Sequence, residues 1–165
     1  MRQVTICIEY YMFFHQSYLF SVNEMEHLEG LEMTVENKKE RRDVYRRLFE
    51  NSRDAIYITS KSGKFIDVNP AFLNLFGYAR NELKQMNALR LYIDQYKRKF
   101  FISEMERNKF VNDFEVKLRR SNGKIIDCII SADARTSKDG FIIGYQGIIH
   151  DVTDKIIAEN TAKRG

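Results

Sequence analysis

Three segments in the last third of the chain alternate apolar and polar residues and are separated by tight turns. The first includes residues 114–119, and the other two cover 125–135 and 141–150. An Asn-Gly pair lies within the turn at 121–124, and a glycine ends the turn at 138–140. Alternation with a period of two is typical of strands that are buried on one side, and such short turns join neighbouring antiparallel strands. The pattern therefore predicts three strands in hairpin order, and the rest of the chain must complete and cover their sheet.

Two further strands and three helices are predicted upstream. The strands cover 54–60 and 64–69, with a Ser-Gly turn between them. An Asn-Pro pair then opens a short helix over 70–76, because asparagine caps free amides and proline fits the first helical position. A second short helix is predicted over 81–86 and a longer one over 92–107. The fold class is therefore α+β, with a five-stranded antiparallel sheet and helices on one face.

The length, composition and net charge of the chain restrict the classes of function. The chain has 165 residues, is 44% hydrophobic and contains one proline, which suits one ordinary globular domain. Its net charge of +4 comes from basic clusters scattered among acids, so we expect no nucleic-acid partner. Two cysteines are too few for a disulfide framework or a cysteine-rich metal site. We therefore expect a protein of the cytoplasm.

The first 47 residues have a different pattern of apolar and charged residues from the rest of the chain. Residues 1–22 are apolar but contain Glu9 and His15, and they lack the pattern of a signal peptide or a membrane span. These residues could form either a strand or a helix. Residues 1–20 could also contact a partner, and we do not expect them to contact a membrane. Residues 23–47 have near-heptad apolar spacing with a charged middle. This predicts a helical linker that pairs with its own copy, or a single helix lying on its own domain.

Several motifs occur together in a familiar order. They are D-A-I at 54–56, V-N-P-A-F at 68–72, L-F-G-Y at 75–78 and D-V-T-D-K at 151–155. Each is weak alone, but their order and spacing make residues 45–157 resemble the PAS sensor family. The resemblance implies a five-stranded sheet that holds a ligand pocket against its helices. It also implies that 48–152 is the sensor domain and 153–165 an outgoing signalling helix.

The apolar positions of the strands and helices define a candidate ligand pocket. Either these side chains simply fill a core, or they surround a cavity for a small, largely apolar ligand. The candidate residues are Ile56, Ile58, Val68, Phe72, Phe76, Phe101, Met105, Phe114, Val116, Cys128, Ile130, Tyr145 and Ile149.

The cofactor is unknown, and we expect neither flavin nor haem. The light-sensing relatives need a reactive cysteine in an Asn-Cys-Arg helix, whereas Cys128 falls in a predicted strand. Haem needs an axial ligand, and the long helix has no histidine, which leaves Met105 or Tyr96 as alternatives. His150 is expected to point out of the core, and the histidines are too far apart in sequence to suggest a metal site. No nucleotide-binding or nucleophile motif occurs, so we predict no enzyme and no catalytic residue.

Apolar residues also occur at outward positions of the last two strands, so the second face of the sheet is expected to be covered. The resemblance implies that an N-terminal helix packs there and completes a parallel homodimer. The predicted dimer face comprises Leu28, Leu31, Val35, Ile125, Ile129, Ile142 and Ile148.

Asp151 and Thr153 stand where the last strand gives way to the outgoing helix. Their side-chain oxygens can accept hydrogen bonds from the first free amides of that helix, which predicts a signal-exit cap. The resemblance implies a sensory input module of a two-component or related system. It would bind a small molecule and relay the signal through flanking helices to a histidine kinase or cyclic-dinucleotide enzyme that is not in this chain. The alternative is a ligand-free module for dimerisation and protein interaction.

Overall fold

The computed structural model describes residues 35–164, and contacts divide the chain into two units at Phe49. The first unit contributes most of helix α2 (Val35–Asn51), which continues beyond the end expected at residue 47. The predictions for residues 1–22 and for Leu28 and Leu31 lie outside the described residues. Val35 is the first residue of α2.

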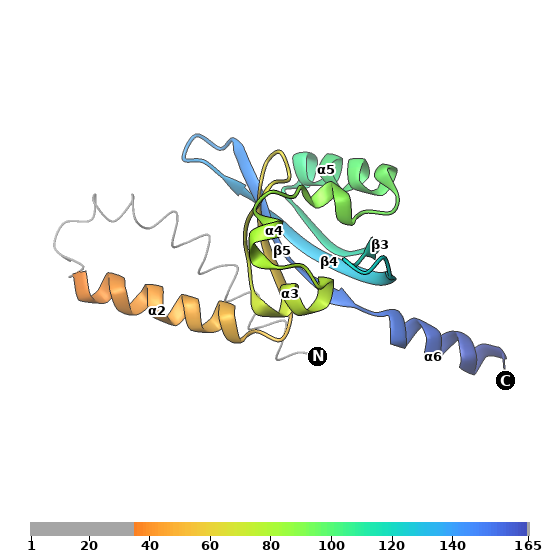
Figure 1. Ribbon diagram of the computed structural model, residues 1–165. Coiled ribbons are helices and arrows are strands. Elements are labelled where there is room, and N and C mark those ends of the chain that lie inside the picture. The colour runs from red at the N-terminus through yellow and green to blue at the C-terminus, as the bar shows by residue number, and fades with distance from the viewer. Residues whose placement is uncertain (1–34, 165) are drawn as a thin grey trace. The chain divides into compact units, whose positions relative to one another are not determined.

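The second unit contains a five-stranded antiparallel sheet with the order β2-β1-β5-β4-β3 (Figure 1). The last strand in sequence is therefore the central one, and it pairs with both β1 and β4. The predicted α+β fold with five antiparallel strands and flanking helices is confirmed. The strands are β1 (Ala55–Ser60), β2 (Phe65–Val68), β3 (Phe110–Arg119), β4 (Ile125–Thr136) and β5 (Ile142–Asp151).

The helices between β2 and β3 cover one face of the sheet (Figure 1). They are α3 (Pro70–Phe76), α4 (Arg80–Leu83), the 3-10 helix η1 (Ala88–Leu91) and α5 (Gln95–Asn108). Helix α3 begins as predicted, because the Asn69 side chain accepts a hydrogen bond from the Phe72 amide and Pro70 occupies the first helical position. It ends at Gly77, whose φ of 74° is readily adopted only by a residue without a Cβ. After β5, helix α6 (Thr153–Arg164) leaves the sheet.

The sheet register shows which residues face the helices. In β1 these are Ala55 and Tyr57, which belong to the main core cluster. Ile56 and Ile58, predicted as pocket residues, are buried on the opposite face instead. The prediction was wrong because both parities of β1 are apolar, so alternation alone could not select the inner one.

β-Bulges explain the other departures from simple alternation. A register shift between β1 and β2 lets Phe65 and Val68 both reach the core although they are three residues apart, while Ile66 is exposed. A second shift, between β4 and β5, reverses the parity at the start of β5. Ile142, predicted on the outer face, therefore packs against the core cluster, and Ile143 is exposed in its place.

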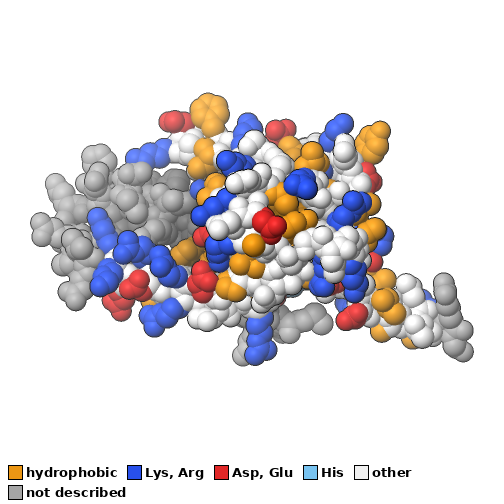
Figure 2. Space-filling view, viewed as in Figure 1, with side chains coloured by type: hydrophobic (Ala, Val, Ile, Leu, Met, Phe, Trp, Pro, Cys, Tyr) orange, Lys and Arg blue, Asp and Glu red, His pale blue; other side chains and the backbone are white. Residues whose placement is uncertain are grey.

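The surface of the described residues is mixed in character. Figure 2 shows Lys and Arg side chains gathered along α2 and interspersed among uncharged groups over the sheet unit. Within residues 35–164, no helix combines the length and the apolar character that crossing a bilayer requires.

Candidate ligand site and exit joint

The candidate pocket is the layer between the sheet and its covering helices. All of the predicted pocket residues except Ile56 and Ile58 lie in this layer. Phe114 is partly buried at its edge, and the others are buried within one cluster. The structure thus brings these side chains together, and their role in holding a ligand stays a prediction.

Aromatic rings form much of this layer. The Phe72 ring lies 5.4 Å from that of Phe65 and 4.6 Å from that of Phe76, measured between centroids. On the other side, the Phe101 ring meets Phe114 edge-on at 5.6 Å and Tyr145 at 6.2 Å. Such edge-to-face and tilted contacts are the favoured arrangements of aromatic pairs. The layer therefore offers an apolar, aromatic surrounding.

One charged residue is buried among these rings. Arg98 is 8% exposed, and its guanidinium lies 5.2 Å from the ring centroids of both Tyr92 and Phe101. Its Nη1 is 3.5 Å from the Tyr92 hydroxyl, which is a long hydrogen bond. Sequence reasoning missed Arg98 because it stands between two lysines and looks like part of a solvated face. The available signal was its helical spacing from Phe101 and Met105, which share the buried side of α5.

Three tyrosines surround this part of the core. Burial raises the pKa of Tyr57, Tyr92 and Tyr145, while the charge of Arg98 acts in the opposite direction on each. Their hydroxyls therefore stay protonated and can donate hydrogen bonds at neutral pH. The Tyr145 hydroxyl is buried without a hydrogen-bond partner among the described residues. The layer thus carries neutral donors, from strands β1 and β5 and from the end of η1, in addition to the apolar groups.

The cofactor alternatives can be compared with these positions. Burial raises the pKa of the Cys128 thiol to about 12, so the thiol stays protonated at neutral pH. Tyr96 is 79% exposed and cannot serve as an internal haem ligand, whereas Met105 is fully buried in the core cluster. Across residues 35–164, no group of three or more His, Cys, Asp or Glu side chains is arranged to hold a metal ion.

The exit from the sheet is a compact hydrogen-bonded joint. Asp151 Oδ1 accepts from the Thr153 amide at 3.0 Å and from the Thr153 hydroxyl at 2.6 Å. The Thr153 hydroxyl oxygen in turn accepts from the Asp127 amide of β4 at 3.0 Å. Val152 donates its amide to the Asp127 carbonyl at 2.8 Å, and Arg120 lies 3.4 Å from Asp151 Oδ2.

These contacts refine the predicted cap. Asp151 receives the first amide of α6, as predicted. The Thr153 oxygen does not cap a helix amide but accepts from the neighbouring strand. The difference arises because Thr153 is itself the first helical residue and its side chain turns back toward β4. The start of α6 is consequently fastened to β4 and β5 together.

The outer face of the sheet contains Ile148, which pairs with Ile56 and is 3% exposed. Ile129 lies beside His150 on the same face, and Ile125 is exposed near the β3–β4 turn. These three isoleucines are turned away from the core, as the predicted dimer face requires. Ile148 is already buried within the single chain, so it offers little surface to a second subunit, and contact of a second subunit with Ile125 and Ile129 stays a prediction.

His150 also points away from the core, as expected. Its Nδ1 lies 3.3 Å from Asp54 Oδ1 at the start of β1. The hydrogen bond with this carboxylate raises the pKa of His150, against the smaller opposing effect of its partial burial. The pair joins the end of β5 to the residue before β1.

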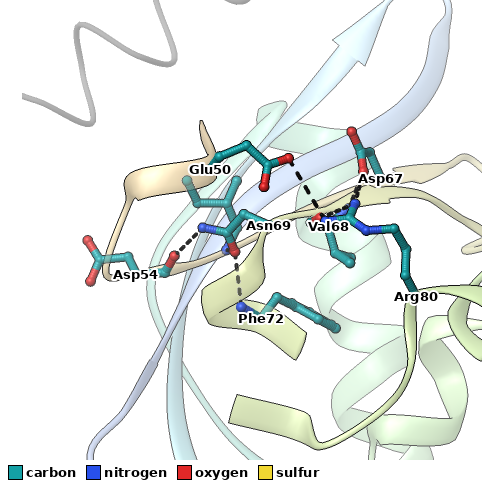
Figure 3. A network of polar contacts seen from close by, with 8 residues as sticks. Glu50, Asp54, Asp67, Val68, Asn69, Phe72 and Arg80 are labelled. Atoms are coloured by element: carbon teal, nitrogen blue, oxygen red, sulfur yellow. Dashed lines mark hydrogen bonds and ion pairs between the residues drawn. The ribbon is translucent and has the colours of Figure 1, made fainter. Parts of the chain in front are cut away.

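The start of the sheet unit is organised by a second polar network (Figure 3). Asn69 Oδ1 accepts from the Ile56 amide at 2.9 Å and from the Phe72 amide at 3.0 Å, while its Nδ2 donates to the Asp54 carbonyl at 2.8 Å. One buried side chain thus connects the segment before β1, strand β1 and helix α3.

Arg80 forms the other half of this network (Figure 3). Its Nη1 donates to Asp67 Oδ1 at 2.8 Å and to the Val68 carbonyl at 2.7 Å. Its Nη2 lies 3.9 Å from Glu50 in the last turn of α2. Helix α4 is therefore tied to β2.

Comparison with known proteins gives one consistent family. The family model described as the PAS domain matches residues 53–154. No curated protein matches the chain.

Solved structures of PAS domains share the fold. The PAS domain of a protein from Colwellia psychrerythraea is 22% identical with a TM-score of 0.61, and the match covers 71% of this chain and 98% of that one. A domain of the sensory box sensor histidine kinase/response regulator from Geobacter sulfurreducens is 27% identical with a TM-score of 0.58, covering 70% and 98%. An RNA-binding light-oxygen-voltage receptor is 18% identical with a TM-score of 0.68, covering 83% of this chain and 40% of the receptor.

Proposed function

Because this chain belongs to the PAS domain family, we propose that it is a sensory input module that binds a small, largely apolar molecule in the layer between sheet and helices. The apolar and aromatic character of that layer supports a ligand of this kind. Its fold is like that of PAS domains from sensor histidine kinases, which supports a role in signalling.

The observation that carries this proposal is the exit joint. Asp151, Thr153 and Asp127 connect the end of the central strand, the start of α6 and the neighbouring strand β4 through hydrogen bonds. The core faces of the same two strands contribute Tyr145, Ile149, Cys128 and Ile130 to the candidate pocket. A ligand that shifts these strands would therefore alter the position from which α6 departs. In thermodynamic terms, it would shift the population between two arrangements of the helix.

The output of such a module would be the pairing of helices in a homodimer. Val44 and Leu48 of α2 are exposed one helical turn apart and offer an apolar strip for a second copy. On the sheet unit, the outward-facing Ile125 and Ile129 would offer a separate apolar surface to the second copy. The effector would be a histidine kinase or a cyclic-dinucleotide enzyme attached to α6, in the cytoplasm.

The second candidate is a ligand-free dimerisation module. The complete burial of Phe72, Phe76, Phe101 and Met105 favours it, because a core filled by its own side chains leaves no room for a guest. The two candidates share the helices and the joint, and they differ in whether the core binds a ligand.

Native mass spectrometry of the purified protein, before and after denaturation, separates them. A co-purifying small molecule, or a rise in melting temperature with a panel of small apolar compounds, supports the sensor. A dimer with no bound mass and no thermal shift contradicts it and supports the interaction module. Oligomeric state is read from the same spectra.

The relay through the joint has its own test. We expect ligand binding to change amide exchange across residues 153–164 in the wild-type chain. Thr153→Val removes the hydroxyl that ties α6 to Asp127 and should abolish this change. Thr161→Val is the matched control, because that hydroxyl bonds only the Ile157 carbonyl within α6. An equal response in both variants would refute a relay through Thr153.

A further inference from the structure

The most unusual side chain of the core is the buried Arg98. Its guanidinium contacts two aromatic rings and one tyrosine hydroxyl. Among residues 35–164, no carboxylate lies within the 4.0 Å that defines an ion pair with it. Buried cations are normally paired, because removing a charge from water is costly unless an opposite charge or several hydrogen bonds compensate. Arg98 is therefore a buried cation without a counter-ion among the described residues.

The neighbouring backbone is shaped to admit the guanidinium. Gly63, in the turn between β1 and β2, adopts a φ of 87°, and a Cβ there would lie 3.2 Å from Arg98 Nη2. It would also lie 2.9 Å from Oδ1 of Asn87, the residue before η1. A side chain at position 63 would therefore crowd the head of Arg98, and the glycine keeps that position open.

Neutral hydrogen-bond donors complete the surroundings. The Tyr92 hydroxyl lies next to the guanidinium, and the Phe101 ring contacts both the Arg98 guanidinium and the Tyr145 ring. Tyr145 is buried with a hydroxyl that has no partner among the described residues. Tyr57, Tyr92 and Tyr145 all experience the charge of Arg98. One positive charge with phenolic donors nearby matches a single negative charge that can accept several hydrogen bonds.

We propose that Arg98 binds the carboxylate of a small organic acid, with the tyrosine hydroxyls as further donors and the aromatic core holding the apolar body of the ligand. This assignment rests on the proposed sensory function and adds the chemical class of the ligand. A carboxylate fits better than a phosphate, because Arg98 supplies one positive charge, whereas a phosphate monoester carries between one and two negative charges at neutral pH. Binding of the acid would supply the counter-ion that Arg98 otherwise lacks.

The experiment compares acids with their uncharged counterparts. Calorimetric titration at pH 7 uses a series of monocarboxylates from acetate to octanoate together with phenylacetate, each matched by its primary amide, and adds phenyl phosphate. We expect at least one acid to bind about tenfold or more tightly than its amide, since a charge-assisted hydrogen bond contributes that much. Arg98→Gln should remove this preference. Lys99→Gln, which deletes an exposed charge on the same helix, should keep it.

A structural role for Arg98 predicts a different pattern. It predicts a large fall in melting temperature for Arg98→Gln, whereas loss of an uncompensated buried charge should leave the melting temperature unchanged or raise it. The wild-type comparison of acids with amides needs no variant, so it decides the assignment even if Arg98→Gln does not fold.

Each remaining result has a defined meaning. If amides bind as well as acids, or if Arg98→Gln keeps the preference, the carboxylate site is refuted while small-molecule binding stands. Tighter binding of phenyl phosphate than of phenylacetate also refutes it, in favour of a phosphate headgroup. If neither acids nor amides nor the apolar panel bind, both the carboxylate site and the sensory proposal are refuted.

Discussion

Replacing Asn69 with alanine should damage the fold far more than the loss of one polar surface group. Asn69 is fully buried, and its amide group makes hydrogen bonds with the Ile56 amide, the Phe72 amide and the Asp54 carbonyl. Alanine would remove the cap of α3, at a cost of about 1 kcal/mol. It would also deprive two further backbone groups of a partner, at roughly 1–3 kcal/mol each when they are buried. We expect the free energy of unfolding to fall by about 3–7 kcal/mol in total.

Urea denaturation followed by circular dichroism at 222 nm measures this change, since the chain contains no tryptophan. With a slope of about 2 kcal/mol per M for a domain of this size, a loss of 3 kcal/mol lowers the midpoint by about 1.5 M. Asn74→Ala is the matched control, because Asn74 is exposed on the same helix. It should change stability by less than about 0.5 kcal/mol. A loss below about 1 kcal/mol in Asn69→Ala would refute the view that Asn69 organises the start of the sheet.

Three further predictions concern the sheet. Asp54 raises the pKa of His150 above its ordinary 6.5, so the pair stabilises the fold fully below pH 6.5 and loses this contribution as the pH rises through the higher pKa of the folded state. The difference in free energy of unfolding between wild type and Asp54→Asn should therefore shrink from pH 6 to pH 9. A constant difference would contradict the pairing. In a Cys7→Ser background, Cys128 should react with an aromatic disulfide reagent only slowly until urea unfolds the protein, and rapid native labelling would contradict its raised pKa. Gly147→Ala should cost about 2 kcal/mol or more in urea denaturation, since a Cβ there would meet backbone and side-chain atoms of β4 at 2.6–3.0 Å, and an unchanged midpoint would mean that the strands separate easily.

The fold was predictable because its signals are local. Alternation in β3 and β4, the turns between the last strands and the Asn69 cap each depend on a few neighbouring residues. The inner face of β1 could not be predicted, because both of its faces are apolar and alternation does not show which face of such a strand is the inner one. The prediction that Ile142 lies on the outer face was wrong for another reason. A β-bulge depends on how two strands pair, and the sequence of one strand gives little indication of it.

The candidate site shows the same division. Apolar residues such as Phe72 and Phe101 were found by their spacing, and the structure places them in the core. Arg98 was missed because its residue type argues for solvent while its position argues for the core. A polar side chain at a buried position occurs most often where that side chain has a function besides folding. Thr153 was recognised as a capping residue, but its bond to Asp127 depends on a strand 26 positions away in sequence.

The position of β5 has a consequence for how the module is made. β1 with β2, and β3 with β4, form two separate antiparallel pairs, and β5 alone joins them. During synthesis these pairs emerge from the ribosome first and have no shared edge until residues 142–151 follow. The contacts that close the sheet therefore span most of the domain, a topology that slows folding and leaves strand edges open for longer. Since α6 starts directly after β5, the outgoing helix has a completed sheet to anchor it only once folding has finished.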